Sequence, residues 1–358
     1  VYAAALNTAL SSPNPITTST IFADEPTTFT YNGTSYQPED FERGQWQGNV
    51  TVRKAFADSL NVPAVEVAQA AGYGKVADLA HEAGLENIQP TPAEALGAYN
   101  VTPLEIARAY TIFANDGVEV EPRFISRIID KNGTQMWASQ SDTKQILDPR
   151  INYLVVSLMQ EVLRSGTGAG VRAYGFTLPA AAKTGTSHDA WFAGFTSKLL
   201  CVVWVGLDDY RQIHMQGADA ALPVWAEFMK LAHQHAAYSD VTDFPMPPGI
   251  VSARIDPLSG ELATTACPDP QTEYYILGTQ PTQFCPLHRA GPTEVAGWET
   301  SPAAPQAAMP ASPAGEAQTA PGVSALPQQP GMDPGGQPPQ QQPKKKKGFF
   351  DKLKSIFH

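Results

Sequence analysis

The sequence predicts an α+β fold in which helices pack against an antiparallel sheet. Segments with helical periodicity dominate residues 52–117 and 148–168. Three strand-like segments follow between residues 178 and 209, and their connections are too short for the crossovers that parallel strands need. A last helical segment at 222–237 can pack on this sheet and complete the unit.

The first fifty residues contribute little regular structure to this expectation. Residues 1–6, "VYAAAL", read as a helix already under way, so we expect the sequence to begin inside a longer chain. Residues 11–50 are polar and rich in turns, which is typical of an extended insertion. From Val52 the pattern is helical until it breaks at Asn61-Val62-Pro63, because proline disfavours helix just before it. Ser59 and Asn61 are therefore predicted on a short loop between two helices.

The middle of the chain carries clear start and stop signals. Thr102 is a candidate N-cap for a helix that ends by Gly117, and Asp148 is the N-cap of the strongest helical segment. Between them, residues 118–140 read as a β-hairpin that turns at Lys131-Asn132-Gly133.

The C-terminal third divides into segments of different composition. The first domain ends near residue 243, and residues 244–298 resemble a small β-rich appendage. Residues 299–343 consist largely of Pro, Ala, Gln, Gly and Ser, which predicts a disordered linker. Residues 344–358, "KKKKGFFDKLKSIFH", have the basic amphipathic pattern of a segment that contacts an anionic membrane surface or a protein partner.

Charge and cysteine content restrict the functional classes. The net charge is −11, and the last fifteen residues contain six lysines and one aspartate. The remaining residues are therefore strongly acidic, which argues against nucleic acid as the main partner. The sequence has no apolar run that could span a bilayer and no signal peptide.

Three cysteines are present. Cys201 lies in an apolar strand-like run and is predicted to be a core residue. Cys267 and Cys285 lie in a polar, proline-rich segment, where a disulfide would indicate an oxidising, extracytoplasmic location. Free thiols remain an alternative, and so does a zinc site with His288, although the paired CxxC spacing is absent.

The segment Lys183-Thr184-Gly185-Thr186-Ser187 suggests a peptide-binding strand. A glycine inside a strand often marks the close approach of another backbone, and an edge strand with such a gap can add an extended peptide to its sheet. Neighbouring hydroxyls and a lysine would hold the terminal carboxylate of that peptide. On the tripeptide alone, an ordinary edge strand with a solvent-facing lysine is the favoured interpretation, and a simple helix break explains Ser59-Leu60-Asn61 in the same way.

Together these two motifs resemble those of the transpeptidase domain of class A penicillin-binding proteins, the bifunctional peptidoglycan synthases. That superfamily carries SxxK, an SxN-type motif and KTG. Here the second is Ser59-Leu60-Asn61 and the third Lys183-Thr184-Gly185. The similarity covers about residues 1–235. It extends to sequence outside the motifs, such as "LGAYNVTPLEIARAYTIFANDG" and "DAWFAGFTSKLLCVVWVGLDD". It implies the penicillin-binding/β-lactamase-like serine transpeptidase fold.

The resemblance implies acyl transfer from D-Ala-D-Ala stem peptides through a serine ester, with β-lactam antibiotics as inhibitors. Carried over by motif, Ser59 relays a proton to the leaving amine and Asn61 binds the substrate amide. Lys183 supplies positive charge, Thr184 and Thr186 contact the carboxylate, and the Thr186 N–H provides half of an oxyanion hole. Gly185 and Ser187 complete the substrate-binding strand. This chemistry requires no cofactor and no metal.

One expected motif is missing. The nucleophilic serine of SxxK should precede Ser59 at the start of a helix, and no residues before Ser59 fit. The literal match Ser141-Asp142-Thr143-Lys144 lies in a polar turn and is predicted to be a solvated loop. In the family, text like "VYAAAL" follows the motif, so we expect the nucleophile just before Val1 and this chain alone to be inactive.

The resemblance also implies a periplasmic location, an upstream membrane anchor and a glycosyltransferase domain. Three alternatives remain open, one of which is a structural role in which the proline-rich tail and the basic segment tether other proteins. A D,D-carboxypeptidase or β-lactamase-like hydrolase of the same superfamily would pass the acyl group to water. A non-catalytic module would bind muropeptides in the same cleft without covalent labelling.

Overall fold

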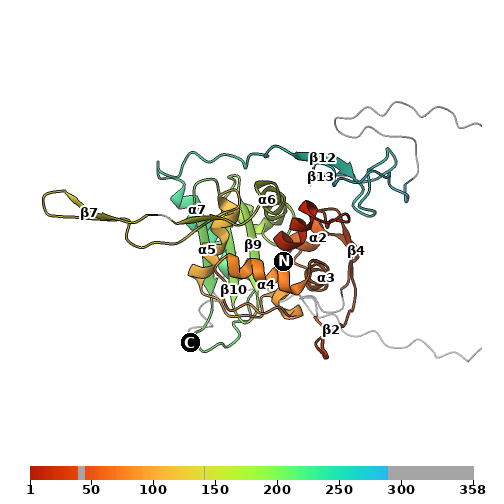
Figure 1. Cartoon of the computed structure of the whole chain (residues 1–358), viewed down its shortest axis with the longest axis horizontal. Coiled ribbons are helices and arrows are strands. Elements are labelled where there is room, and N and C mark those ends of the chain that lie inside the picture. Colours follow the sequence, from red (N-terminus) through yellow and green to blue (C-terminus); the bar gives the residue numbers. More distant parts are fainter. Residues whose placement is uncertain (39–44, 141, 289–358) are drawn as a thin grey trace, which may run out of the picture. The chain divides into compact units, whose positions relative to one another are not determined.

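A three-stranded antiparallel sheet in the order β11–β10–β9 lies at the centre of the structure. Its strands are β9 (Ala181–Thr186), β10 (Ala190–Phe195) and β11 (Leu200–Val205). The computed structural model describes residues 1–38, 45–140 and 142–288. The predicted α+β class and antiparallel sheet are confirmed, and β9 lies at an edge of the sheet (Figure 1).

Helices cover both faces of this sheet. On one face Trp225 of α7 (Gly217–Ala232) lies with its ring 5.0 Å from that of Phe192 on β10. On the other face Phe195 joins the main core, which includes buried side chains of α6 (Pro149–Arg164) and α5 (Pro103–Ala114). Because side chains alternate along a strand, Phe192 and Phe195 point to opposite faces, and the sheet is buried between helices.

Two helices begin where the sequence predicts. The Asp148 carboxylate accepts a hydrogen bond from the Arg150 N–H (2.8 Å) at the start of α6. Thr102 and Glu105 form a reciprocal capping box at the start of α5. The α5 helix ends at Ala114, three residues before the predicted stop.

The start of α7 differs from the prediction. The helix begins at Gly217 and not at Leu222, so Pro223 lies inside it. Proline favours the first helical turn, which is why the sequence pattern placed the start too late. Ala220, Ala221 and Leu222 are all buried, and their packing compensates for the hydrogen bond that Pro223 does not donate.

The N-terminal region is more ordered than an inserted loop. Strand β4 (Gly48–Thr51) pairs with β1 (Ile21–Asp24), and Val50 of β4 is buried just before the chain enters α2 (Val52–Ala57). Asn61 is the first residue of α3 and not part of the loop, because Pro63 is accommodated in the first turn of that helix. The elements of this region are α1 (Tyr2–Leu6), η1 (Asn7–Leu10), β1 (Ile21–Asp24), β2 (Phe29–Tyr31), β3 (Thr34–Tyr36), β4 (Gly48–Thr51), α2 (Val52–Ala57), α3 (Asn61–Ala71) and α4 (Tyr73–Glu82).

A hairpin formed by β6 (Arg127–Ile129) and β7 (Gln135–Ala138) extends away from the sheet (Figure 1). It turns at Gly133, which has a φ of +85°, as the sequence predicts. The remaining short elements are η2 (Pro92–Leu96), β5 (Val118–Val120), β8 (Thr143–Gln145) and η3 (Ala169–Tyr174).

The C-terminal part of the described chain is built on a second hairpin, β12 (Ile250–Ile255) and β13 (Gln271–Ile276). Glu273 of β13 is buried and accepts two hydrogen bonds from Arg53 of α2, one of them at 2.7 Å. The Arg53 guanidinium also donates to the Ser157 carbonyl of α6 at 2.9 Å. This buried ion pair joins the hairpin to the helices beside the sheet.

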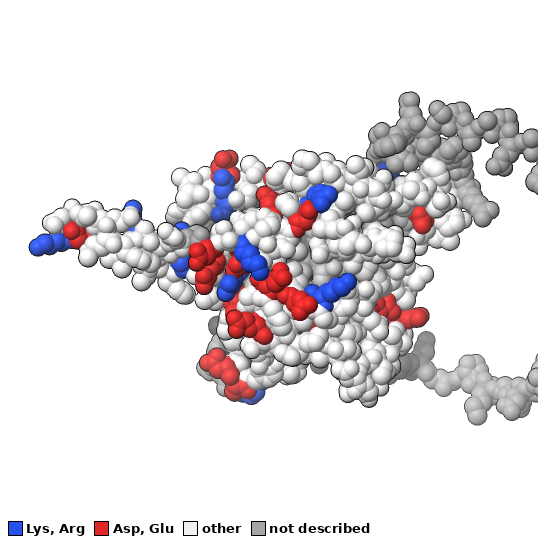
Figure 2. Space-filling view, in the orientation of Figure 1, with Lys and Arg blue, Asp and Glu red and all other residues white. Residues whose placement is uncertain are grey.

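The expected linker at 299–343 and the basic segment at 344–358 lie outside the described residues. Within the described ranges, no helix combines the length and apolarity needed to cross a membrane. On the face shown in Figure 2, acidic and basic side chains are intermixed and do not form a field of one sign.

Candidate active site

Ser59 lies on a tightly constrained turn between α2 and α3. Its φ of +58° is left-handed, which is uncommon for a residue other than glycine, and its N–H donates to the Phe56 carbonyl at 3.2 Å. A second segment fixes this turn, since the Thr167 N–H donates to the Ala57 carbonyl at 3.0 Å. A Cβ on Gly166 would lie 2.3 Å from that same carbonyl oxygen. Gly166 therefore permits the close approach that holds the Ser59 turn.

Lys183 connects the two sequence motifs. Its Nζ donates a hydrogen bond to Ser59 Oγ at 2.7 Å and to the Thr184 carbonyl at 3.1 Å. The ammonium group also lies 5.7 Å from the centre of the Phe56 ring. Burial lowers the pKa of Lys183 to about 8, because a low-dielectric surrounding disfavours the charged form. An ammonium group that can lose its proton near pH 8 thus lies directly beside the Ser59 hydroxyl.

The two threonines of β9 are held by partners that the sequence motifs did not include. Thr184 Oγ1 lies 2.6 Å from Thr167 Oγ1, and the Gly217 N–H donates to Thr186 Oγ1 at 2.9 Å. Gly217 begins α7, and a Cβ there would lie 2.5 Å from the Gly185 carbonyl oxygen. The positive end of α7 can therefore approach the end of β9 this closely because Gly217 has no Cβ.

Ser187 makes a different contact from that expected of a substrate-binding residue. Its hydroxyl donates to Asp189 Oδ1 at 2.6 Å, and the Trp204 indole N–H donates to Asp189 Oδ2 at 2.7 Å. Ser187 still lines the cleft described next, but in this structure its hydroxyl is oriented toward Asp189.

An open cleft of about 1130 Å³ runs along β9 and the Ser59 turn. A smaller cavity of about 190 Å³ lies against the same motif residues and is also lined by Tyr2 and Phe56. Each predicted site residue lines at least one of the two, namely Ser59, Asn61, Lys183, Thr184, Gly185, Thr186 and Ser187. Among the residues that the structure describes, no strand pairs with the outer edge of β9. The site thus combines an open strand edge with hydroxyl, amide and ammonium groups.

The family model described as "Penicillin binding protein transpeptidase domain" matches residues 14–230, which is more than half of the chain. The chain belongs to this family. A second model, described as the C-terminal domain of penicillin-binding protein 1A, matches residues 246–290. The recognition made from Ser59-Leu60-Asn61 and Lys183-Thr184-Gly185 is confirmed.

Curated relatives of this chain are also penicillin-binding proteins. Penicillin-binding protein 1A of Aquifex aeolicus is 33% identical over 258 residues, covering 71% of this chain and 35% of the relative. Penicillin-binding protein 1A of Neisseria meningitidis is 32% identical over 269 residues, covering 71% of this chain and 32% of the relative. The chain therefore spans about a third of the length of these relatives.

Solved structures share the fold. The crystal structure of penicillin-binding protein 1A from Haemophilus influenzae matches with a TM-score of 0.71 and 27% identity, covering 79% of this chain and 47% of that one. PonA1 of Mycobacterium tuberculosis in complex with penicillin V matches with a TM-score of 0.54 at 23% identity, covering 69% of this chain and 70% of that one. The second similarity concerns the fold alone.

The literal SxxK match takes no part in this site. Ser141 lies outside the described residues, while Thr143 and Lys144 are exposed on β8, which pairs with β5. Neither Thr143 nor Lys144 lines the cleft or the smaller cavity. The prediction of a solvated position holds for these two residues, although they form a short strand and not a loop.

The structure corresponds to one of the alternatives for the cysteines of the C-terminal part, that of free thiols. Cys267 and Cys285 are both free cysteines in the structure. The Cys285 thiol donates instead to Asp256 Oδ2 at 2.8 Å. Asp256 was missed at the sequence level because a lone aspartate eleven residues before the first cysteine of this segment matches no ligand spacing.

Proposed function

We propose that this chain forms most of the D,D-transpeptidase site of a bifunctional peptidoglycan synthase. The observation that carries the proposal is the hydrogen bond of 2.7 Å between Lys183 Nζ and Ser59 Oγ. It joins the two family motifs beside an open strand edge, across a sequence separation of 124 residues. Membership of the penicillin-binding transpeptidase family supports the assignment.

The stem peptide binds as an added strand along the outer edge of β9. Lys183 supplies positive charge for its terminal carboxylate, with the Thr184 and Thr186 hydroxyls beside it. The backbone N–H of Thr186 stabilises the developing oxyanion, and Asn61 orients the substrate amide. The hydrogen bond that Gly217 donates keeps the Thr186 side chain in place for this role.

The attacking serine is supplied by residues that precede Val1 in the complete protein. Its hydroxyl adds to the penultimate D-Ala carbonyl, the peptide bond breaks, and free D-alanine leaves with a proton relayed through Ser59. An amine of a neighbouring strand then displaces the serine and forms the cross-link. The cavity lined by Tyr2, Phe56, Ser59 and Lys183 supports this placement, because it lies between the first helix and both motifs. The 358 residues alone are therefore inactive.

The same proposal covers location and partners. The complete protein acts on the periplasmic face of the inner membrane, where stem peptides and β-lactams are accessible, and carries an upstream anchor and glycosyltransferase domain. The basic segment at 344–358 contacts the membrane surface or the cell-wall machinery. The catalytic steps need neither a cofactor nor nucleic acid.

The test begins with the coding sequence upstream of Val1, which should continue into a Ser-x-x-Lys. The longer protein should form a covalent adduct with a fluorescent penicillin on that serine, located by peptide mass spectrometry, while the 358-residue chain stays unlabelled. Cross-linked muropeptide dimers support transpeptidation, whereas trimmed monomers alone would show a carboxypeptidase. A true translation start at Val1, with reversible muropeptide binding only, would replace the enzyme by a binding module.

A further inference from the structure

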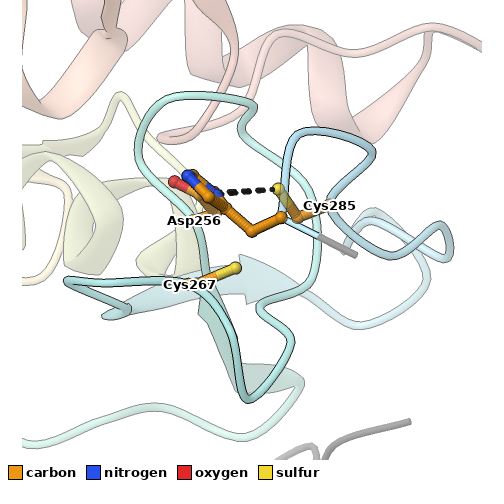
Figure 3. Close-up of side chains that lie close together, drawn as sticks. Asp256, Cys267 and Cys285 are labelled. Atoms are coloured by element: carbon orange, nitrogen blue, oxygen red, sulfur yellow. Dashed lines mark hydrogen bonds and ion pairs between the residues drawn. The ribbon is translucent and has the colours of Figure 1, made fainter. Parts of the chain in front are cut away.

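Four side chains of zinc-binding type converge in the C-terminal module, defined here as residues 246–288. They are Asp256, Cys267, Cys285 and His288, and their ligand atoms all lie within 4.8 Å of one another. Figure 3 shows the two sulfur atoms and the Asp256 side chain gathered between the loops that follow β12 and β13. The geometry points to a structural Zn²⁺ site with a Cys₂-His-Asp ligand set, separate from the transpeptidase cleft.

The distances suit a tetrahedral ion. With zinc bonds of 2.0–2.3 Å, two ligand atoms of a tetrahedral site lie about 3.3–3.8 Å apart. Cys285 Sγ and His288 Nδ1 are 3.5 Å apart. Asp256 Oδ2 lies closer, at 2.8 Å from Cys285 Sγ and 2.5 Å from His288 Nδ1, as hydrogen bonds require. Moving this carboxylate outward by roughly 1 Å would replace the hydrogen bonds with ligand–ligand edges of a zinc site.

Three of the four ligands are buried, and their surroundings orient them. Asp256 is 1% exposed, Cys285 3% and Cys267 7%, while His288 is partly exposed. The Leu258 N–H donates to Asp256 Oδ1 at 2.9 Å, which leaves Oδ2 facing the thiols. Such outer contacts are what fix the ligands of a metal site in place.

Thr264 supports the cluster from a second direction. Its N–H donates to Cys267 Sγ at 3.2 Å, a contact that stabilises a thiolate. Its hydroxyl donates to the carbonyl of His288 at 2.6 Å and so holds the end of the module next to Cys267. One residue therefore positions two of the four ligands.

The C-terminal module has little apolar core of its own, so metal bonds would stabilise it. Its own apolar clusters are small and consist of Ala253, Ile255, Leu262 and Tyr275, with Ala263 beside the two cysteines. Small units of this kind are commonly held by a metal or a disulfide. A disulfide would use the two sulfur atoms and leave Asp256 and His288 to pair with each other, whereas zinc uses all four groups. Binding releases the two thiol protons to solvent, and His288 binds as a neutral imidazole with no proton on its ligand nitrogen.

The experiment uses the full 358-residue chain, exported to an oxidising compartment and purified without reductant. We expect one zinc per chain by elemental analysis after gel filtration, and three titratable thiols after denaturation in chelator. Exchange with Co²⁺ should produce thiolate-to-metal charge-transfer and tetrahedral d–d absorption bands. This measurement needs no substitution and is unaffected by whether the transpeptidase proposal holds.

Matched variants locate the site. His288→Ala and Cys285→Ser should weaken zinc binding by about a hundredfold or more, since even outer partners of zinc ligands cost 10–100-fold. The controls Cys201→Ser and His235→Ala, which lie in β11 and just after α7, should retain one zinc.

Three results would overturn the inference. One is a metal-free chain with a single titratable thiol, which would show a disulfide between Cys267 and Cys285. Another is a metal-free chain with three thiols that does not bind Co²⁺. The third is metal retention by both His288→Ala and Cys285→Ser, which would place the ion elsewhere.

Discussion

The transpeptidase cleft and the Cys₂-His-Asp cluster assemble their polar groups in opposite ways. The cleft brings Ser59, Thr167, Lys183 and Gly217 together from four separate parts of the chain. The cluster draws its four side chains from residues 256–288, within one small module. A site made from distant segments depends on the whole fold, whereas a local site depends on the loops that carry it.

This difference has a consequence for stability and for function. The cleft remains open along β9, and its lysine is paired to a hydroxyl and not to a carboxylate. The cluster is closed, and each of its groups already has a partner within the module. The open cleft therefore leaves polar groups available for a substrate, while the closed cluster stabilises the loops of the module.

The largest expected effect tests the cleft directly. Lys183→Ala in the complete protein should slow acylation by penicillin about 10²–10⁴-fold, as expected for loss of a group that assists proton transfer and charge stabilisation. The second-order rate constant with a fluorescent penicillin measures this change. Lys198→Ala, an exposed lysine in the turn between β10 and β11, is the control and should label normally. Equal rates for both variants would remove Lys183 from the mechanism.

The next effect concerns the ion pair that joins the C-terminal module to helix α2. Glu273→Ala leaves the buried Arg53 guanidinium without its counter-charge and should lower the free energy of unfolding by about 3–5 kcal/mol. Urea denaturation measures this change. Lys54→Ala, one residue along α2, removes an exposed pair with Asp58 and should cost less than about 0.5 kcal/mol. A small effect of Glu273→Ala would mean that this ion pair does not stabilise the contact between the module and the helices.

A smaller effect tests the close approach at the end of β9. Gly217→Ala places a Cβ 2.5 Å from backbone oxygens of Gly185 and Trp191, so the start of α7 must shift. We expect a loss of about 1–3 kcal/mol in stability together with slower acylation. Gly170→Ala is the control, since its Cβ would meet only Leu222 at 3.8 Å. A Gly217→Ala protein that matches wild type in both measurements would show that this packing does not hold Thr186.

The smallest effect is the pH dependence of the acylation rate. Burial lowers the pKa of Lys183 from 10.5 to about 8. If the ammonium form assists acylation, the rate should fall about tenfold per pH unit above 8, and Lys183→Arg should show no such fall. A wild-type rate that instead rises through pH 8 would assign the role to the neutral amine.

The lowered pKa of Lys183 also makes the free energy of unfolding depend on pH. Between pH 8 and 10.5 the unfolded chain binds the Lys183 proton more tightly than the folded chain does. The unfavourable contribution of this buried lysine therefore diminishes as pH rises through that interval. Denaturation midpoints of wild type and Lys183→Met across these pH values measure the difference.

The sequence predicted the parts that depend on local pattern. Helix caps at Thr102 and Asp148 and the three strands of the sheet follow from capping chemistry and alternation. The proximity of Ser59 and Lys183 came from the family resemblance, because no local rule brings together two residues so far apart in the chain.

Other parts could not be predicted because their signal is purely spatial. Thr167 and Gly217 have ordinary sequence surroundings, and only the folded chain shows that they position Thr184 and Thr186. Asp256 belongs to no spacing motif, so the sequence left a disulfide, free thiols and a zinc site with His288 as alternatives for Cys267 and Cys285. Pro223 delayed the predicted start of α7 because burial can outweigh a lost hydrogen bond.

The ion pair between Arg53 and Glu273 also constrains the order of folding. The two residues are separated by 220 positions, so at roughly 5–20 residues per second the arginine is synthesised about 10–45 s before its partner. During that time the Arg53 guanidinium lacks the carboxylate that accepts two hydrogen bonds from it, and the helices around it cannot complete their packing without cost. We therefore expect the body of the domain to complete its packing only after the C-terminal module has been synthesised, and a chain interrupted before residue 273 to be more sensitive to proteases.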